Sequence, residues 1–80
     1  MTFQQFNRLS AVEQEIAVWY IGVAVADRIE GDIRYLLFQL DSFYIEITYV
    51  INLNSITRIL AFDDMELLEP YLANIRIDLD

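Results

Sequence analysis

Residues 33–50 have the sequence IRYLLFQLDSFYIEITYV, and the fold follows from this segment. Its apolar side chains recur with the two-residue period of a β-strand on both sides of Asp41-Ser42, a dipeptide that favours tight turns. A two-residue loop at this dipeptide predicts an antiparallel hairpin. The hairpin then sets four pairs of residues opposite each other: Leu40 and Phe43, Phe38 and Ile45, Leu36 and Ile47, and Arg34 and Tyr49.

Two further strands extend this hairpin on either side. The sequence predicts strands over 23–29, 33–40, 43–52 and 56–62, with turns at Glu30-Gly31 and Asn52–Ser55. Connections this short require antiparallel neighbours, so the strands form a meander. The outer hairpins are predicted to pair Val23 with Phe38, Val25 with Leu36, Asp27 with Arg34, Ile45 with Phe62, Ile47 with Leu60, and Tyr49 with Arg58. All three turns then agree on one apolar face of the sheet.

Helices are expected before the strands. Thr2 to Gln5 and Ser10 to Glu13 match the capping-box pattern, and they predict a short helix over 3–8 and a main helix over 11–21. The main helix carries apolar residues at helical spacing, which we expect to face the core: Val12, Ile16, Trp19, Tyr20 and Val23. Gly22 is expected to end this helix in a left-handed conformation.

The segment after the strands begins with acids from Asp63 onward, which suit the start of a helix. The apolar residues that follow keep helical spacing: Met65, Leu68, Leu72 and Ile75. Pro70 predicts either a break near Glu69 or two short helical turns. Residues 75–79 alternate in polarity, as a short strand or an ordered tail would.

We therefore predict one α+β domain over residues 1–80. It has one or two N-terminal helices, a four-stranded antiparallel meander and a C-terminal helix, with the helices packed on one sheet face. The core is expected around Trp19, Leu36, Phe38, Ile45, Ile47 and Leu60. The composition is 56% hydrophobic, more than one core of this size needs, so part of the apolar surface is expected to meet a partner.

The charged residues are five arginines and thirteen acids, which give a net charge of −8. This charge repels nucleic-acid phosphates and anionic membranes, so neither is expected as a partner. The absence of cysteine excludes disulfides and thiolate-bound metals, and it favours the cytoplasm as the location. The longest apolar run, from Ile16 to Ala26, is far shorter than the roughly 20 residues of a transmembrane helix. Acids precede this run, whereas a signal peptide begins with basic residues.

Few residues of this sequence could carry catalysis. It has no histidine, cysteine or lysine, so no base is available to activate its serines. We therefore expect neither enzymatic activity nor a cofactor. Asp63, Asp64 and Glu66 form the densest acidic cluster, but their spacing is not that of a calcium loop. Helix capping explains these acids better, and no metal site is expected.

One polar row is the candidate ligand site. The predicted register aligns Asp27, Arg34, Tyr49 and Arg58 across the four strands, on the side that faces the helices. Two guanidinium groups beside a phenol could hold a carboxylate or a phosphate. The alternative is structural: Asp27 forms an ion pair with Arg34, and Arg58 reaches an acid of the C-terminal segment.

The second sheet face is the candidate interface. It carries apolar and aromatic residues that the predicted helices would leave uncovered: Tyr35, Leu37, Tyr44, Thr48 and Ile59. A two-fold dimer that stacks these faces would cover them. In the alternative, the N-terminal segment or the tail after Ile75 folds across this face and completes a monomer.

The function expected first is therefore that of a non-enzymatic protein-interaction module that self-associates or docks on another protein. The second expectation is a domain that binds small anions through Arg34, Tyr49 and Arg58. The third is an acidic mimic of nucleic acid that blocks a basic site, an idea that depends on net charge alone.

Several phrases occur together along the chain: FNRL at 6–9, GVAVADR at 22–28, YLLFQLD at 35–41, FYIEITY at 43–49 and LEPYL at 68–72. In this combination the chain resembles, from end to end, a family of bacterial hypothetical proteins of about 80 residues. The resemblance implies a stand-alone bacterial protein and no particular activity.

Overall fold

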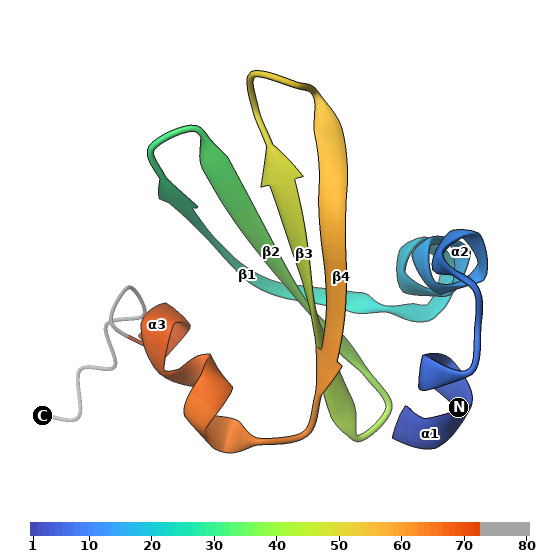
Figure 1. Ribbon diagram of the computed structural model, residues 1–80. Helices are drawn as coiled ribbons and strands as arrows, with labels where there is room; N and C mark the ends of the chain where they lie inside the picture. Colours follow the sequence, from blue (N-terminus) through green and yellow to red (C-terminus); the bar gives the residue numbers. More distant parts are fainter. Residues whose placement is uncertain (73–80) are drawn as a thin grey trace, which may run out of the picture.

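The computed structural model describes residues 1–72 (Figure 1). Helices α1 (Phe3–Asn7) and α2 (Ala11–Ile21) precede four strands, β1 (Val23–Glu30), β2 (Ile33–Leu40), β3 (Phe43–Val50) and β4 (Ser55–Phe62). A 3₁₀-helix, η1 (Met65–Leu68), and the short helix α3 (Glu69–Leu72) follow. The strands form one antiparallel sheet in the order β1-β2-β3-β4. This confirms the predicted α+β meander between N-terminal and C-terminal helices, while the strand or tail expected at 75–79 lies outside the described residues.

The central hairpin has the predicted register in all four pairs, from Leu40 opposite Phe43 to Arg34 opposite Tyr49. Asp41 adopts a left-handed conformation with φ 53°, which aspartate tolerates better than most residues because its short polar side chain can bond to nearby backbone. This turn therefore fixes which residues of β2 and β3 share a face.

The first hairpin differs from its predicted register. The turn lies at Gly31-Asp32, where Gly31 has φ 62°, so Asp27 pairs with Leu36 and not with Arg34. A β-bulge between Ala24 and Ala26 then shifts the pairing of residues 23 and 24 back by one residue, so that Ala24 lies opposite Phe38. The predicted pairs of Val23 with Phe38 and Val25 with Leu36 are therefore wrong.

The third hairpin contains a second bulge with a larger consequence. Val50 pairs with Ser55 around a longer turn, and Tyr49 pairs with Ile56. Thr48 then pairs with Arg58, so the pairing skips Thr57. One extra residue turns every later side chain of β4 to the opposite face. The predicted pairs of Ile45 with Phe62, Ile47 with Leu60 and Tyr49 with Arg58 are therefore wrong.

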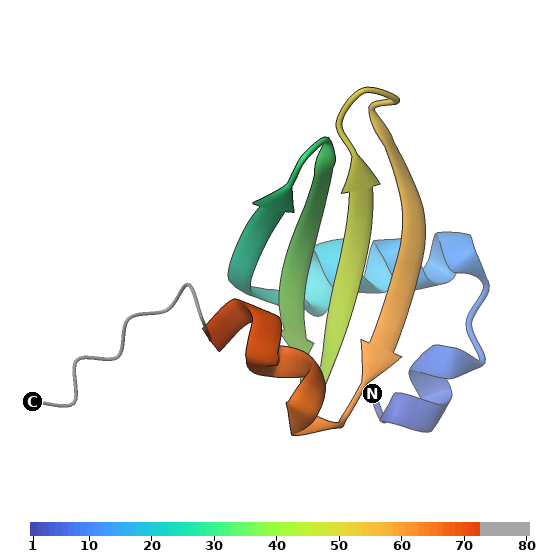
Figure 2. The ribbon, with the colours of Figure 1, turned by 60° about the vertical axis from the view of Figure 1, so that its left-hand side comes forward.

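The sheet carries a core on each face. On the first face, α1 and α2 cover a cluster of buried residues: Phe6, Ala17, Val18, Phe38, Leu40, Phe43, Ile45 and Ile47. On the second face, η1 and α3 cover a smaller cluster: Leu37, Phe62, Leu68 and Tyr71. Figure 2 shows α2 running across the strands on one side and α3 lying on the other. The prediction that all helices share one face is correct for α1 and α2 only, because the bulge in β4 turns Leu60 and Phe62 to the second face, where the C-terminal segment packs.

The helix termini follow the capping signals of the sequence. Thr2 and Ser10 both form complete capping boxes, with Gln5 and Glu13 as their partners. Two short helical turns succeed each other at the C-terminal end, as Pro70 predicted, and Asp64 caps η1 by accepting a hydrogen bond from the backbone N–H of Glu66 (3.0 Å). Among residues 1–72, no helix combines the length and apolar character required to cross a membrane.

Gly22 plays a different part from the one predicted. Its backbone is extended, with φ −77° and ψ 150°, so it is not a left-handed cap. A Cβ atom at this position would lie 2.5 Å from the carbonyl oxygen of Val18, closer than real Cβ contacts allow. Gly22 is therefore required because the chain turns from α2 into β1 against the last turn of the helix.

Gly22→Ala is expected to lower the free energy of unfolding by about 1–3 kcal/mol, the usual cost of an added methyl group without space. Chemical denaturation of both proteins measures the difference. Gly31→Asn is the matched control, because no atom lies within 4 Å of a Cβ built there and asparagine tolerates a left-handed φ. Equal stability of Gly22→Ala and the parent protein would contradict the close approach to Val18.

Candidate interaction surface

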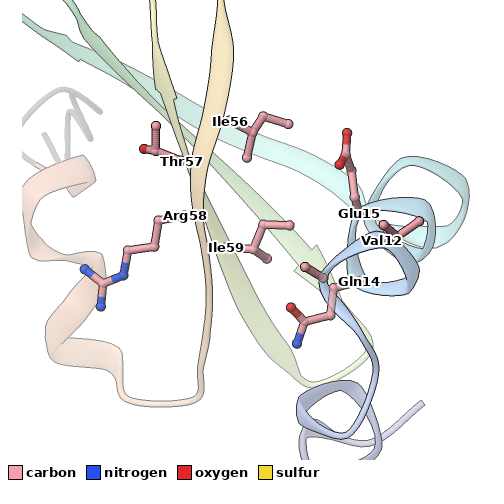
Figure 3. A pocket seen from close by; sticks show the side chains of 8 residues that line it. Val12, Gln14, Glu15, Ile56, Thr57, Arg58 and Ile59 are labelled. Atoms are coloured by element: carbon pink, nitrogen blue, oxygen red, sulfur yellow. The ribbon is translucent and has the colours of Figure 1, made fainter.

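The predicted polar row does not assemble as a row of four. Arg34 forms an ion pair with Asp27 (2.9 Å), and both side chains are about half exposed. Tyr49 donates a hydrogen bond from its hydroxyl to the side-chain oxygen of Asn54. Arg58 belongs to the second sheet face, and Figure 3 shows its side chain on the opposite side of β4 from α2. Arg34 is thus engaged by a carboxylate and separated from Arg58 by the sheet.

The predicted interface is likewise divided between the two faces. Tyr35, Leu37, Tyr44 and Thr48 lie on the second face as expected, but Leu37 is buried beneath η1 and α3, and Tyr35 and Tyr44 pack against the same cluster. Ile59 lies on the first face beside the α1 and α2 core. The chain's own η1 and α3 therefore cover much of this face, whereas the alternative named the N-terminal segment or the tail after Ile75.

A polar cluster, which we call the Arg28 cluster, holds the C-terminal segment to the sheet. It consists of Arg28, Tyr35, Glu46 and Tyr71. The Tyr71 hydroxyl donates a hydrogen bond to Oε2 of Glu46 (2.6 Å), and Nη2 of Arg28 lies 3.7 Å from the same oxygen. The Arg28 guanidinium also stacks on the Tyr35 ring, 3.9 Å from its centroid. Burial, and then the bond to Glu46, raise the pKa of the Tyr71 phenol above its usual value.

Sequence reasoning missed the Arg28 cluster for a specific reason. Arg28 and Glu46 lie on different strands, 18 residues apart in the sequence, and the pairing of Arg28 with Tyr35 depends on the register of the first hairpin. Tyr71 adjoins Pro70, where the course of the chain was left open. The only signal in the sequence is a single glutamate between two apolar strand residues, Ile45 and Ile47, since such a carboxylate needs a cationic or hydroxyl partner if it is buried.

The outer side of α2 carries a row of exposed apolar side chains that no element of the described residues covers. Four side chains are exposed there: Val12 (67%), Ile16 (51%), Trp19 (51%) and Tyr20 (83%). At 100° per residue they occupy an arc of about 100° on the helix. We call this set the α2 stripe. Ala17 and Val18 form the buried side of the helix, so the prediction that the stripe faces the core is wrong.

Specific side-chain contacts fix the orientation of α2. The Gln14 side chain donates a hydrogen bond to the carbonyl of Phe6 (3.1 Å), which ties α2 to α1. Trp19 meets Phe38 edge-on, with ring centroids 5.3 Å apart, so only part of its indole is covered. A helix that is apolar on both sides is typical of a buried helix, yet half of this one faces outward.

A groove of about 270 Å³ lies between α2 and β4, and its lining combines apolar side chains such as Val12 and Ile59 with polar ones such as Glu15. Figure 3 shows Ile56 and Ile59 of β4 pointing toward α2 and Val12 at the helix edge. The stripe and this groove together form a surface suited to contact with another apolar face. Comparisons of the chain with protein-family models, curated proteins and solved structures found no match.

Proposed function

We propose that this chain is a non-enzymatic protein-interaction module of the bacterial cytoplasm that binds through the α2 stripe. The observation that carries the proposal is the exposure of Val12, Ile16, Trp19 and Tyr20 at helical spacing on one side of α2. Apolar anchors at positions i, i+4, i+7 and i+8 are the pattern by which a helix docks on another protein.

The chemistry of the stripe supports a protein partner. Tryptophan and tyrosine are enriched at interfaces and among the residues that dominate binding energy, because each buries a large apolar area at little conformational cost. The net charge of −8 opposes binding to nucleic acid or to anionic lipid. The lack of histidine, cysteine and lysine in the sequence supports a role without catalysis.

Photo-crosslinking in cells tests this function directly. A benzophenone amino acid in place of Tyr20 is expected to capture protein on illumination, because this side chain projects from the stripe. The control is the same substitution at Leu53, another exposed apolar residue, in the turn between β3 and β4, which Figure 1 shows well away from α2. Capture at position 20 that does not exceed capture at position 53 would contradict the proposal. The mass of the product separates a second copy of the chain from a different protein.

A further inference from the structure

The exposed area of the α2 stripe sets the size of interface that it can form. With about 150–250 Å² for a whole aromatic side chain, the four exposed residues present on the order of 500 Å². Weak, reversible complexes bury up to about 1,200 Å² in total, shared between the two partners. The total area buried between two copies of the stripe falls in this range when exposed Val23 and the rim of the neighbouring groove are included.

The stripe is also complementary in shape to itself. Ile16 lies at its centre, the small Val12 lies one turn toward the N-terminus, and the large Trp19 and Tyr20 lie one turn toward the C-terminus. An antiparallel pairing of two α2 helices about Ile16 sets Val12 of each copy at the level of Tyr20 of the other, because both are four residues from the centre. Large side chains then fill the space beside small ones, as well-packed interfaces require.

The surroundings of α2 leave this approach open. Figures 1 and 2 show α2 on the outside of the first sheet face and α3 on the opposite side of the sheet. Among residues 1–72 no other element lies over the stripe, since α1 and the sheet contact the buried side of α2. Two copies can therefore meet helix to helix without displacing any described element.

The acidic residues beside the stripe make the stability of such a pairing depend on salt concentration. Glu13 and Glu15 flank it, one on each side, and a two-fold axis brings equivalent flanks together. The resulting repulsion acts over about the Debye length of 8–10 Å near physiological ionic strength, so added salt screens it. A self-pairing of this acidic chain is therefore strengthened by salt, whereas binding to a basic partner is weakened.

From these observations we infer that the occupant of the α2 stripe is a second copy of this chain, paired antiparallel about a two-fold axis at Ile16. The inference rests on the proposed function and names its partner. Because the area buried between the two copies is small, we expect the dimer to dissociate readily, with a Kd in the micromolar range.

Sedimentation velocity tests the dimer. The dimer fraction is expected to rise with protein concentration and, at fixed concentration, with added sodium chloride. Ile16→Glu is expected to weaken association about tenfold or more, because it places a carboxylate in the apolar contact. Leu53→Glu carries the same charge change far from α2 and is expected to leave the Kd unchanged. Tyr20→Glu, at the most exposed position of the stripe, provides a second disrupting variant whose fold depends least on the replaced side chain.

The single tryptophan of the chain gives an independent measurement. Trp19 is half exposed, so its emission is expected to shift to shorter wavelength as the parent protein associates and to stay constant with concentration in Ile16→Glu. A parent protein that stays monomeric at high concentration and high salt would overturn the dimer, as would association that both stripe variants leave intact. Capture of a different protein at position 20 would then leave the proposed function standing, whereas absence of any capture would remove both.

Discussion

Ile47→Ala is expected to lower the free energy of unfolding by about 2–5 kcal/mol, the cost of deleting a large apolar side chain from a packed core. Ile47 is fully buried in the middle of β3, opposite Leu36 of β2 and Ile59 of β4. A domain of this length has a total stability of roughly 4–12 kcal/mol. The substitution is therefore expected to remove a large part of the stability and to lower the melting temperature strongly.

Thermal unfolding followed by circular dichroism measures this effect. Ile29→Ala is the matched control, since it makes the same change in an exposed side chain of the edge strand β1. Its effect is expected to stay within about 0.5 kcal/mol, as for most surface substitutions. An unchanged melting midpoint for Ile47→Ala would mean that the first sheet face does not carry the main core.

The central hairpin could be predicted from sequence because the residues that determine its register lie close together in the chain. Asp41-Ser42 specifies the turn, and β3 keeps a clear alternation of buried apolar residues and less buried residues away from it. The two bulges could not be predicted in the same way. β1 begins with four consecutive small or apolar residues, and β4 ends with Ile59, Leu60, Ala61 and Phe62, so a shift of one residue leaves each pattern equally apolar. Alternation carries no register information where both faces are apolar.

The orientation of α2 is a second case of the same limitation. Its apolar residues lie on both sides, and helical spacing alone cannot say which side meets the sheet. The contacts that decide the matter are distant in sequence, such as those that bury Phe6 and Val18 against the sheet. The excess of apolar residues over the needs of one core did predict an exposed surface, but it could not place that surface on α2.

The bulge at Thr57 also explains why the second sheet face is covered, although the sequence predicted it to be open. By turning Leu60 and Phe62 to the second face, it creates an apolar patch there for Leu68 and Tyr71 to cover. The chain's own η1 and α3 thereby cover the second face, whereas the outer side of α2 remains an exposed apolar surface. One inserted residue in β4 thus changes which surface is available to a partner.

Tyr71→Ala is expected to lower the free energy of unfolding by about 3–5 kcal/mol, as for other buried aromatic residues. Tyr71 is buried against Leu37 and Phe62 on the second sheet face, and its removal takes away an aromatic contact that holds η1 and α3 there. Tyr71→Phe keeps the ring and removes only the hydrogen bond to Glu46. Its expected cost is about 1–3 kcal/mol, because the half-buried carboxylate loses a partner. Urea denaturation of the three proteins at neutral pH measures both effects.

The Tyr71 hydroxyl also gives the stability of the domain a specific dependence on pH. Burial, and then the hydrogen bond to Glu46, raise the pKa of this phenol above its ordinary value of 10.0. The folded protein therefore holds the proton more tightly than the unfolded chain, so the stabilisation is complete below pH 10 and is lost as the pH rises above it. The other four tyrosines are common to the parent and Tyr71→Phe, so their titration cancels in the comparison. The stability difference between the two proteins is expected to shrink from neutral pH to about pH 11. A difference that stays constant over this range would mean that neither burial nor Glu46 raises the pKa of the Tyr71 phenol in the folded state.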